Sequence, residues 1–395
     1  MQATAELALS VLLLAAGALA QTTHLVGPGG LAQIRDALLI AAPGDLVLAQ
    51  PGTYAQFHCE RRRDDPRRGA GHRRRAYDAS VLSPVCSSDP LCLVVESRTR
   101  ITPPAGQTVH CEGLEFAALP NPFFANHAVL VAGDMATFAQ CTLRATMLPA
   151  LTVDQARVHL QDCTLECVGT ASSSPALSAT SAAISAVRCS LRGSQTTLAL
   201  PGPAVRLRSA TLQGSQLQLL GGAVLFGGPG GTALDLDAAS SAWISDSQLT
   251  GSGTTCPVLN NGGSGRIDRS VLLPSLASCT SLPTALVLGI DSATPPQTGA
   301  PFVVDFRTAP NQLVGVYASS NLGSGALPGL ADQPLGLDAG NAWLAGLVTA
   351  DANGFASAAW TLPNGPFVGV PLFVLGVGLA PPRLELSPPV GGVVR

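Results

Sequence analysis

The sequence predicts an all-β protein: a right-handed parallel β-helix capped by an N-terminal helix, followed by a small antiparallel β-sandwich. Pairs of apolar residues, separated by one residue, recur along the chain. In most repeats a second recurring position lies 12 residues after the first member of the pair. Beyond residue 282 these short units give way to longer alternating strands. The 395-residue chain has net charge −3, 12% charged residues, Gly 42 and Pro 31. This composition favours short strands and tight turns and excludes a nucleic-acid binder.

Residues 1–20, MQATAELALSVLLLAAGALA, predict a secretory signal peptide. An apolar run from Leu7 to Leu19 overlaps a small-x-small cleavage site that ends at Ala20, so the mature chain should begin near Gln21. A short membrane anchor is the alternative, although the run falls short of the ~20 residues that a spanning helix needs. No other segment is apolar enough to span a membrane, and we therefore expect a secreted or cell-surface protein.

Residues 31–54 predict the start of the β-helix. Pro43 and Gly44 end a short helix, and Leu46 and Leu48 alternate as the first strand. A helix in this place covers the otherwise exposed end of a stack of coils. The apolar face of that helix consists of Leu31, Ile34, Leu38 and Ala41.

The stretch IRDALLIAAPGDLVLAQPGTY, residues 34–54, resembles the opening of proteins of the pectin-lyase-like superfamily of right-handed parallel β-helices. In those proteins an amphipathic helix plugs the first coil, and a segment of the form APGDxVxxxPGTY makes the first strand and turn. The resemblance implies a β-helix over residues 21–281. It also implies an exposed face of the kind on which pectate lyases carry acidic calcium ligands and an arginine base.

A repeat length of between 20 and 30 residues, with two recurring positions that we call anchors, predicts a β-solenoid. Each coil must stack on the next to bury its apolar stripe. Equivalent residues then form ladders roughly 4.8 Å apart along the axis. The first anchor is an apolar pair, at Val129/Val131, Leu151/Val153, Leu177/Ala179, Val205/Leu207 and Leu234/Leu236.

The second anchor is a small residue followed two positions later by an apolar one. It stands 12 residues after Val129, Leu151, Leu177 and Val258. We expect its cysteines, together with Cys111, to be buried thiols in one internal column. The anchor is assigned to Cys141, Cys163, Cys189, Ser215, Ser247 and Ser270.

Four further cysteines of this exported chain predict two disulfides. Cys86 and Cys92 bracket the loop CSSDPLC. Cys256 and Cys279 lie about one repeat apart, where neighbouring coils place Cα atoms close to the ~5.5 Å that a disulfide prefers. No Cys or His spacing typical of zinc sites occurs. We therefore expect no metal and no cofactor, with Ca²⁺ a candidate only under a lyase function.

Residues 59–100 interrupt the repeat with eight arginines in fifteen positions. Three interpretations stay open: a frame artefact or disordered insertion, a solvated loop, or a basic loop that binds acidic polymers. Because clustered positive charges cannot be buried unpaired, we expect any real segment to be an exposed excursion from the first coils. The candidate binding residues are Arg61, Arg62, Arg63, Arg67, Arg68, Arg73, Arg74 and Arg75.

Residues 282–395 predict a β-sandwich of longer alternating strands separated by Pro/Gly loops. The segment DANG, Asp351 to Gly354, predicts a tight hairpin turn. This domain resembles the C-terminal accessory domains of secreted bacterial surface proteins, a resemblance that implies no site residues.

Outward residues of the first anchor strand form a second candidate site. Stacking of successive coils predicts Arg206 over Asp235 and Arg208 over Asp237, within reach of ion pairing. A surface ion-pair ladder is one interpretation. A catalytic face that also includes Asp154 is the other.

These observations favour a secreted or cell-surface structural or adhesive protein that contacts extracellular polysaccharide or other surface proteins. The alternative is a polysaccharide lyase or glycoside hydrolase that acts on acidic polysaccharide at the exposed face. No Ser-His-Asp motif, P-loop or dinucleotide fingerprint is present. Convergent acid and base groups on stacked coils would favour the enzyme.

Overall fold

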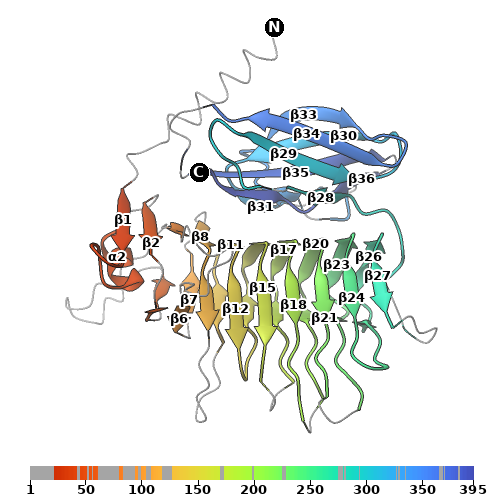
Figure 1. Ribbon diagram of the computed structural model, residues 1–395. Helices are drawn as coiled ribbons and strands as arrows, with labels where there is room; N and C mark the ends of the chain where they lie inside the picture. The colour runs from red at the N-terminus through yellow and green to blue at the C-terminus, as the bar shows by residue number, and fades with distance from the viewer. Residues whose placement is uncertain are drawn as a thin grey trace, which may run out of the picture.

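A three-sided parallel β-solenoid carries an antiparallel β-sandwich along one of its sides (Figure 1). This architecture confirms the predicted fold class. The computed structural model describes residues 22–41, 45–50, 53–55, 57–60, 80–82, 94–96, 99–103, 108–117 and, with short gaps, 127–395.

The N-terminal end of the solenoid is covered by one short helix, α2 (Ile34–Ile40). Ile34, Ala37 and Leu38 of this helix are buried and belong to the same apolar core as the coils. The helix lies between β1 (Thr23–Val26) and β2 (Leu46–Ala49), which pair in parallel. The predicted cap is therefore present, and it shields the first coil from water.

Sheet A is the ten-stranded side of the solenoid, and it faces the sandwich (Figure 1). Its central strands are five residues long, with two side chains pointing into the core and three pointing outward. In order, its strands are β1, β2, β5 (Ser80–Leu82), β8 (Thr108–Glu112), β11 (Met135–Ala139), β14 (Arg157–Gln161), β17 (Ala183–Val187), β20 (Thr211–Ser215), β23 (Ser241–Ser245) and β26 (Ser264–Asp268).

Sheet B is the nine-stranded side that follows sheet A in each coil. A single residue with positive φ, such as Asp162 (φ 54) or Arg188 (φ 51), turns the chain from sheet A to sheet B. Its strands are β27 (Val271–Leu273), β24 (Gln248–Thr250), β21 (Gln218–Leu220), β18 (Ser190–Arg192), β15 (Thr164–Cys167), β12 (Thr142–Ala145), β9 (Glu115–Ala117), β6 (Val94–Glu96) and β3 (Thr53–Tyr54).

Sheet C is the eight-stranded side that contains the predicted apolar pairs. Leu151 pairs with Val129 on one side and with Leu177 on the other, and all three are fully buried. Its strands are β25 (Val258–Asn260), β22 (Leu234–Leu236), β19 (Val205–Arg208), β16 (Leu177–Thr180), β13 (Leu151–Asp154), β10 (Val129–Ala132), β7 (Thr99–Thr102) and β4 (His58–Glu60).

The second anchor lies at the turn between sheets A and B. Cys141, Cys163 and Cys189 each precede the first residue of in-register sheet B strands, and all three are buried. The assignment of Ser215 to this column is wrong, because Ser215 pairs with Val187 in sheet A.

Leu217 takes the anchor position instead of Ser215, since Gln218 pairs with Ser190. Cys111 also lies outside the column: it pairs with Phe138 within sheet A. Ser215 fits the anchor pattern because it is a small residue two positions before the apolar Leu217. Cys111 lies three positions before Leu114, which precedes Glu115, the partner of Thr142.

Two antiparallel sheets make up the C-terminal sandwich. Sheet D contains β28 (Gly289–Asp291), β29 (Pro301–Arg307) and β34 (Phe355–Thr361). Sheet E contains β33 (Trp343–Thr349), β30 (Leu313–Ser319), β35 (Pro371–Ala380), β36 (Arg383–Leu386) and β37 (Val390–Val393), and a separate hairpin pairs β31 (Leu322–Gly325) with β32 (Leu335–Leu337).

The DANG turn is present but does not make a hairpin within one sheet. Asp351 accepts hydrogen bonds from the backbone N–H groups of Asn353 and Phe355, and Gly354 has a φ of +79°. However, β33 pairs with β30 in sheet E, whereas β34 pairs with β29 in sheet D. The turn therefore carries the chain from one layer of the sandwich to the other.

The sandwich lies along sheet A, so that its contacts reach coils far apart in the sequence (Figure 1). The Gly391 N–H donates to Gln161 Oε1 over 2.9 Å, and Arg266 Nη1 contacts Glu385 Oε1 at 3.0 Å. Arg395, the last residue, forms an ion pair with Glu112 on β8. Sheet A is thus an internal interface, and sheets B and C retain the outward faces.

Candidate functional site

The outward face of sheet C holds the predicted cluster of acidic and basic residues. In β19 the side chains of Val205 and Leu207 are fully buried, whereas those of Arg206 and Arg208 point outward. Asp235 on β22 lies in register with Arg206. Strand alternation therefore brings two guanidinium groups to one carboxylate on the next coil.

Both arginines bind the same carboxylate. Arg208 Nη2 donates to Asp235 Oδ2 over 2.7 Å, Arg208 Nη1 reaches Oδ1 at 3.3 Å, and Arg206 Nε reaches Oδ2 at 3.2 Å. The Asp235 side chain is 9% exposed, and those of Arg206 and Arg208 are 34% and 38% exposed. We call these three residues the arginine cluster. Its formal charge is +1, because one carboxylate neutralises only one of two guanidinium groups.

Asp237 does not pair with Arg208 as the sequence predicts. Strand β22 ends at Leu236, and the Asp237 carboxylate instead accepts hydrogen bonds from Ser240 Oγ at 2.6 Å and from the Ser209 N–H at 3.1 Å. The hydrogen bond from Ser240 is the largest cause of a lowered pKa at Asp237. Asp237 therefore stabilises a turn and stays ionised.

Asp154 lies apart from the cluster. It is exposed at the end of β13 and forms no ion pair with another described residue. Between it and Asp237, the same row of the sheet passes through Thr180 and Arg208. Three strand spacings place Asp154 and Asp237 roughly 14 Å apart. Asp154 and Asp237 therefore do not form the close carboxylate pair that glycoside hydrolysis requires.

Hydroxyl groups extend the face toward the N-terminal coils. Thr152 and Ser178 stack in register with Arg206, and Thr180 stacks with Arg208. The Thr152 hydroxyl lies 2.6 Å from His127 Nδ1, and burial lowers the pKa of His127. This row offers neutral hydrogen-bonding groups beside the positive cluster. Among the described residues, no three His, Cys, Asp or Glu side chains converge to hold a metal ion.

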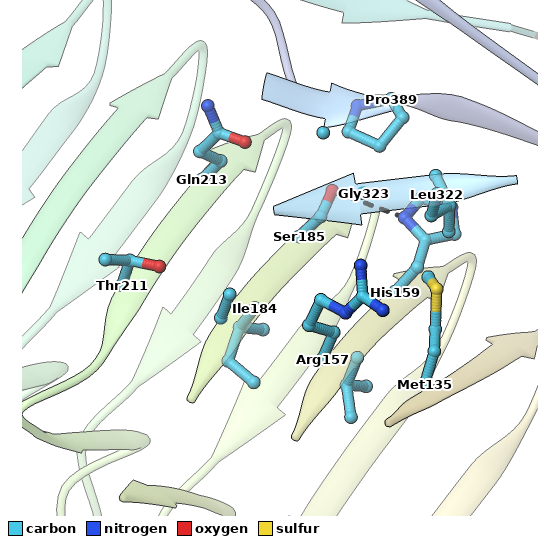
Figure 2. Close-up of a pocket in the computed structure, with 13 residues that line it drawn as sticks. Met135, Arg157, His159, Ile184, Ser185, Thr211, Gln213, Leu322, Gly323 and Pro389 are labelled. Carbon is cyan, nitrogen blue, oxygen red and sulfur yellow. Dashed lines mark hydrogen bonds between the residues drawn. The ribbon is translucent and has the colours of Figure 1, made fainter. Parts of the chain in front are cut away.

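A cavity of about 30 Å³ lies between sheet A and the sandwich (Figure 2). It has room for about two water molecules, and a sugar ring cannot enter it. His159 Nδ1 lies 3.3 Å from Ser185 Oγ, and its ring packs edge-on against Phe373 at 5.7 Å. Burial is the largest cause of the fall in the pKa of His159 to about 3. The cavity belongs to the interface between the solenoid and the sandwich.

A second buried histidine, His110, lies two strands away from His159 in the same sheet. It contacts the hydroxyl of Thr137, and its Nε2 lies 3.4 Å from Glu112 Oε2, the carboxylate that Arg395 also binds. Burial and the nearby Arg395 charge lower the pKa of His110 to about 3. No sequence signal points to this network, because its partner residue lies at the far end of the chain.

Several predicted site residues lie outside the described part of the chain. These include the signal peptide, Cys86, Cys92 and the eight arginines between residues 61 and 75. Cys256 and Cys279 do form a disulfide, with a Cα–Cα distance of 5.4 Å. Cys279 lies in the segment between the last coil and the sandwich, so the bond ties that segment to the loop before β25.

No protein-family model and no curated protein matches the chain. Among solved structures, the chain is similar to the tailspike protein gp49 from Acinetobacter baumannii bacteriophage Fri1, a capsular polysaccharide depolymerase. The identity is 9% and the TM-score 0.22, over 94% of this chain and 82% of that chain. A likeness this weak does not place the chain in the pectin-lyase-like superfamily. The activity of the tailspike is likewise not carried over.

In the described part of the chain no helix is long and apolar enough to cross a membrane.

Proposed function

We propose that this protein is a secreted or cell-surface structural or adhesive module that contacts acidic polysaccharide through the arginine cluster and the neighbouring hydroxyl row. The observation that carries the proposal is the shared carboxylate: two partly exposed arginines bind one nearly buried aspartate. The excess positive charge stays at the surface, where an anionic ligand can reach it.

The chemistry of the two arginines suits a carboxylate on a sugar. Arg206 uses only Nε for Asp235, so its two Nη groups make no hydrogen bond to a described residue. A guanidinium fork pairs well with a planar carboxylate, because two parallel N–H groups can bind its two oxygens. Asp235 fixes the position of both arginines, which reduces the entropy that binding would otherwise lose.

The hydroxyl row gives the ligand a direction. Thr152, Ser178 and Arg206 lie on successive strands, which are roughly 4.8 Å apart. That spacing is comparable to the length of one sugar unit, so an extended chain could contact successive strands along the solenoid axis. Such contacts on an open face bind polysaccharide without enclosing it, as an adhesive module requires.

Affinity gel electrophoresis tests the proposal with polygalacturonate as the acidic polymer and dextran as the neutral one. The wild-type protein should be retarded by polygalacturonate alone, and salt should weaken the retardation because it screens exposed charges. A triple variant, Arg206→Gln, Arg208→Gln and Asp235→Asn, removes the cluster's charge without leaving a buried unpaired carboxylate. It should lose the retardation.

The matched control is Arg144→Gln on sheet B. Arg144 is also an ion-paired surface arginine, 3.2 Å from Glu115 and 3.3 Å from Glu166. Both variants lower the net charge by one, so a general charge effect would change them equally. Equal retardation of the triple variant and the control would refute the arginine cluster as the contact. Equal binding of the wild type to dextran would refute the role of acidic groups.

A further inference from the structure

The outward face of sheet A, which the sandwich covers, carries a continuous row of polar and aromatic side chains. In β14 the side chains of Val158 and Leu160 belong to the solenoid core, so that of His159 between them points outward. Parallel register extends this row along the sheet from β11 to β26. We call the following side chains the sheet A row: Thr137, His159, Ser185, Gln213, Trp243 and Arg266.

The sandwich surface that meets the sheet A row is apolar. Leu322 of β31 and Phe373 of β35 belong to an apolar cluster made mainly of sandwich residues. The cavity between the two surfaces is lined by Leu322 and by three members of the row, His159, Ser185 and Gln213 (Figure 2). An apolar cover suits a polar row poorly, because the covered hydrogen-bonding groups lose water and gain few partners.

Two polar atoms at this interface are buried without a hydrogen bond. His159 is 2% exposed, and its Nε2 has no hydrogen-bond partner among the described residues. Ser245 on β23 lies beside Gly289 of the sandwich, and its buried Oγ also has no partner in the described part of the chain. Buried polar atoms are nearly always paired, because an unpaired one costs free energy. The covered face of sheet A therefore keeps unused capacity for hydrogen bonds.

Polar pairs, more than apolar contacts, hold the sandwich to sheet A. Of the described solenoid residues, Val187 and Met135 join the apolar clusters of the sandwich. The ion pairs across the interface join Arg188 to Asp291, Arg266 to Glu385 and Asp332, and Arg395 to Glu112. Polar contacts between domains of one chain resemble transient protein–protein interfaces, for which relative motion of the domains is expected. The sandwich can therefore separate from sheet A without the loss of a shared apolar core.

The chemistry of the sheet A row suits an uncharged polysaccharide. From Thr137 to Trp243 the row offers hydroxyl, imidazole and amide groups, which can exchange hydrogen bonds with sugar hydroxyls. The indole of Trp243 is a large amphipathic surface on which the apolar face of a sugar ring can stack. Successive strands lie roughly 4.8 Å apart, so the row is straight and matches an extended chain of sugar units.

We propose that the sheet A row is a binding face for a neutral, extended polysaccharide, and that the sandwich is a lid over it. In the closed arrangement Trp243 is 7% exposed, so the row is shielded from a polymer. Separation of the sandwich would expose the whole row to one sugar chain. The arginine cluster lies on sheet C, so this proposal does not depend on the contact with acidic polysaccharide.

A lid-opening variant of the full chain tests the proposal. Asp291→Arg, Glu385→Arg and Arg395→Glu together replace attraction with repulsion at three places along the interface, and all three substitutions lie on the sandwich. Small-angle X-ray scattering should show a larger radius of gyration than that of the wild type. Affinity gel electrophoresis with hydroxyethyl cellulose, a neutral extended polymer, should show retardation of this variant. The wild type should bind about tenfold or more weakly, because few of its molecules are open.

Substitutions within the row locate the contact. In the lid-opening variant, Trp243→Ala and Gln213→Ala should each weaken the retardation by hydroxyethyl cellulose. The matched control is Gln248→Ala on sheet B, an exposed glutamine whose loss should have no effect. A variant that scatters like the wild type would overturn the lid, as would equal retardation of the wild type. An opened variant that is not retarded, or whose retardation survives both row substitutions, would overturn the binding face. Retardation by polygalacturonate reports separately on the arginine cluster.

Discussion

Acid should loosen the attachment of the sandwich through two buried histidines. His110 and His159 are 3% and 2% exposed, and both lie on sheet A beneath the sandwich. His110 is close to Arg395 and Glu112, and His159 packs against Phe373 of β35. A proton on either imidazole would place a further cation in a buried interface that already contains Arg188 and Arg395. The neutral form is therefore the one that the folded protein accepts.

The sign of the effect follows from the direction of both pKa shifts. Each folded-state pKa is about 3, whereas an unfolded histidine titrates near its model value of 6.5. The unfolded chain therefore binds more protons between these values, so stability is complete above pH 6.5 and falls as the pH drops toward 3. The slope of the unfolding free energy against pH approaches about 1.4 kcal/mol per pH unit for each histidine. Between pH 6.5 and pH 5 the two together should lose roughly 3 kcal/mol, a large share of a typical 5–15 kcal/mol stability.

Urea unfolding at intervals between pH 6.5 and pH 5 measures this slope. The urea concentration at the unfolding midpoint of the wild type should fall steeply as the pH is lowered. His110→Gln or His159→Gln should each remove about half of the dependence, and the double variant should remove nearly all of it. Glutamine keeps a hydrogen-bonding group next to Thr137 or Ser185 but does not titrate. A wild-type slope no steeper than that of the double variant would refute the assignment of neutral buried imidazoles.

Four further outcomes follow from the coils, the thiols and the ends of the solenoid. Leu151→Asp should cost several kcal/mol of unfolding free energy, because Leu151 is fully buried; an unchanged melting temperature would contradict the inward assignment. Reduction of Cys256–Cys279, which closes a 23-residue separation, should cost about 3 kcal/mol, and calorimetry with and without reductant would detect it. The Cys163 thiol, whose pKa burial raises well above its usual value, should stay unlabelled by iodoacetamide in the native protein, as peptide mass mapping would show. Deletion of residues 61–75 should leave polygalacturonate binding intact if the arginine cluster is the contact, and loss of binding would move the site to the basic segment.

The coils could be predicted from the sequence because each repeats the same local physics. Inward leucines and valines must match their neighbours above and below, so the pattern at Leu151 recurs at Leu177. The turn between sheets A and B was harder to place, since Ser215 fits the pattern of a small residue two positions before an apolar one, whereas the anchor position holds the larger Leu217. Counting 12 residues from Val205 selects Leu217, which is the residue that the structure places there.

The candidate site could be predicted only in part. Strand alternation places Arg206 over Asp235, and this pairing is present in the structure. Strand β22 ends before Asp237, however, so that carboxylate caps a turn while Arg208 binds Asp235 instead. The interface was beyond prediction for a different reason. Contacts such as Gln161 with Gly391 join residues 230 positions apart, and no periodic pattern records them.

The return of the C-terminus to the first half of the solenoid has a mechanical consequence. Arg395 binds Glu112 on β8, and Gly391 binds Gln161 on β14, although the chain leaves the solenoid only after β27. A pulling force applied between the N-terminal coils and residue 395 would therefore load these contacts directly. The later coils, from β17 to β27, would carry load only through their own contacts with the sandwich, such as Arg266 with Glu385, until the sandwich detached. A molecule under tension at its ends would thus load the coils that carry the arginine cluster indirectly, and it would yield first at the seam between the solenoid and the sandwich.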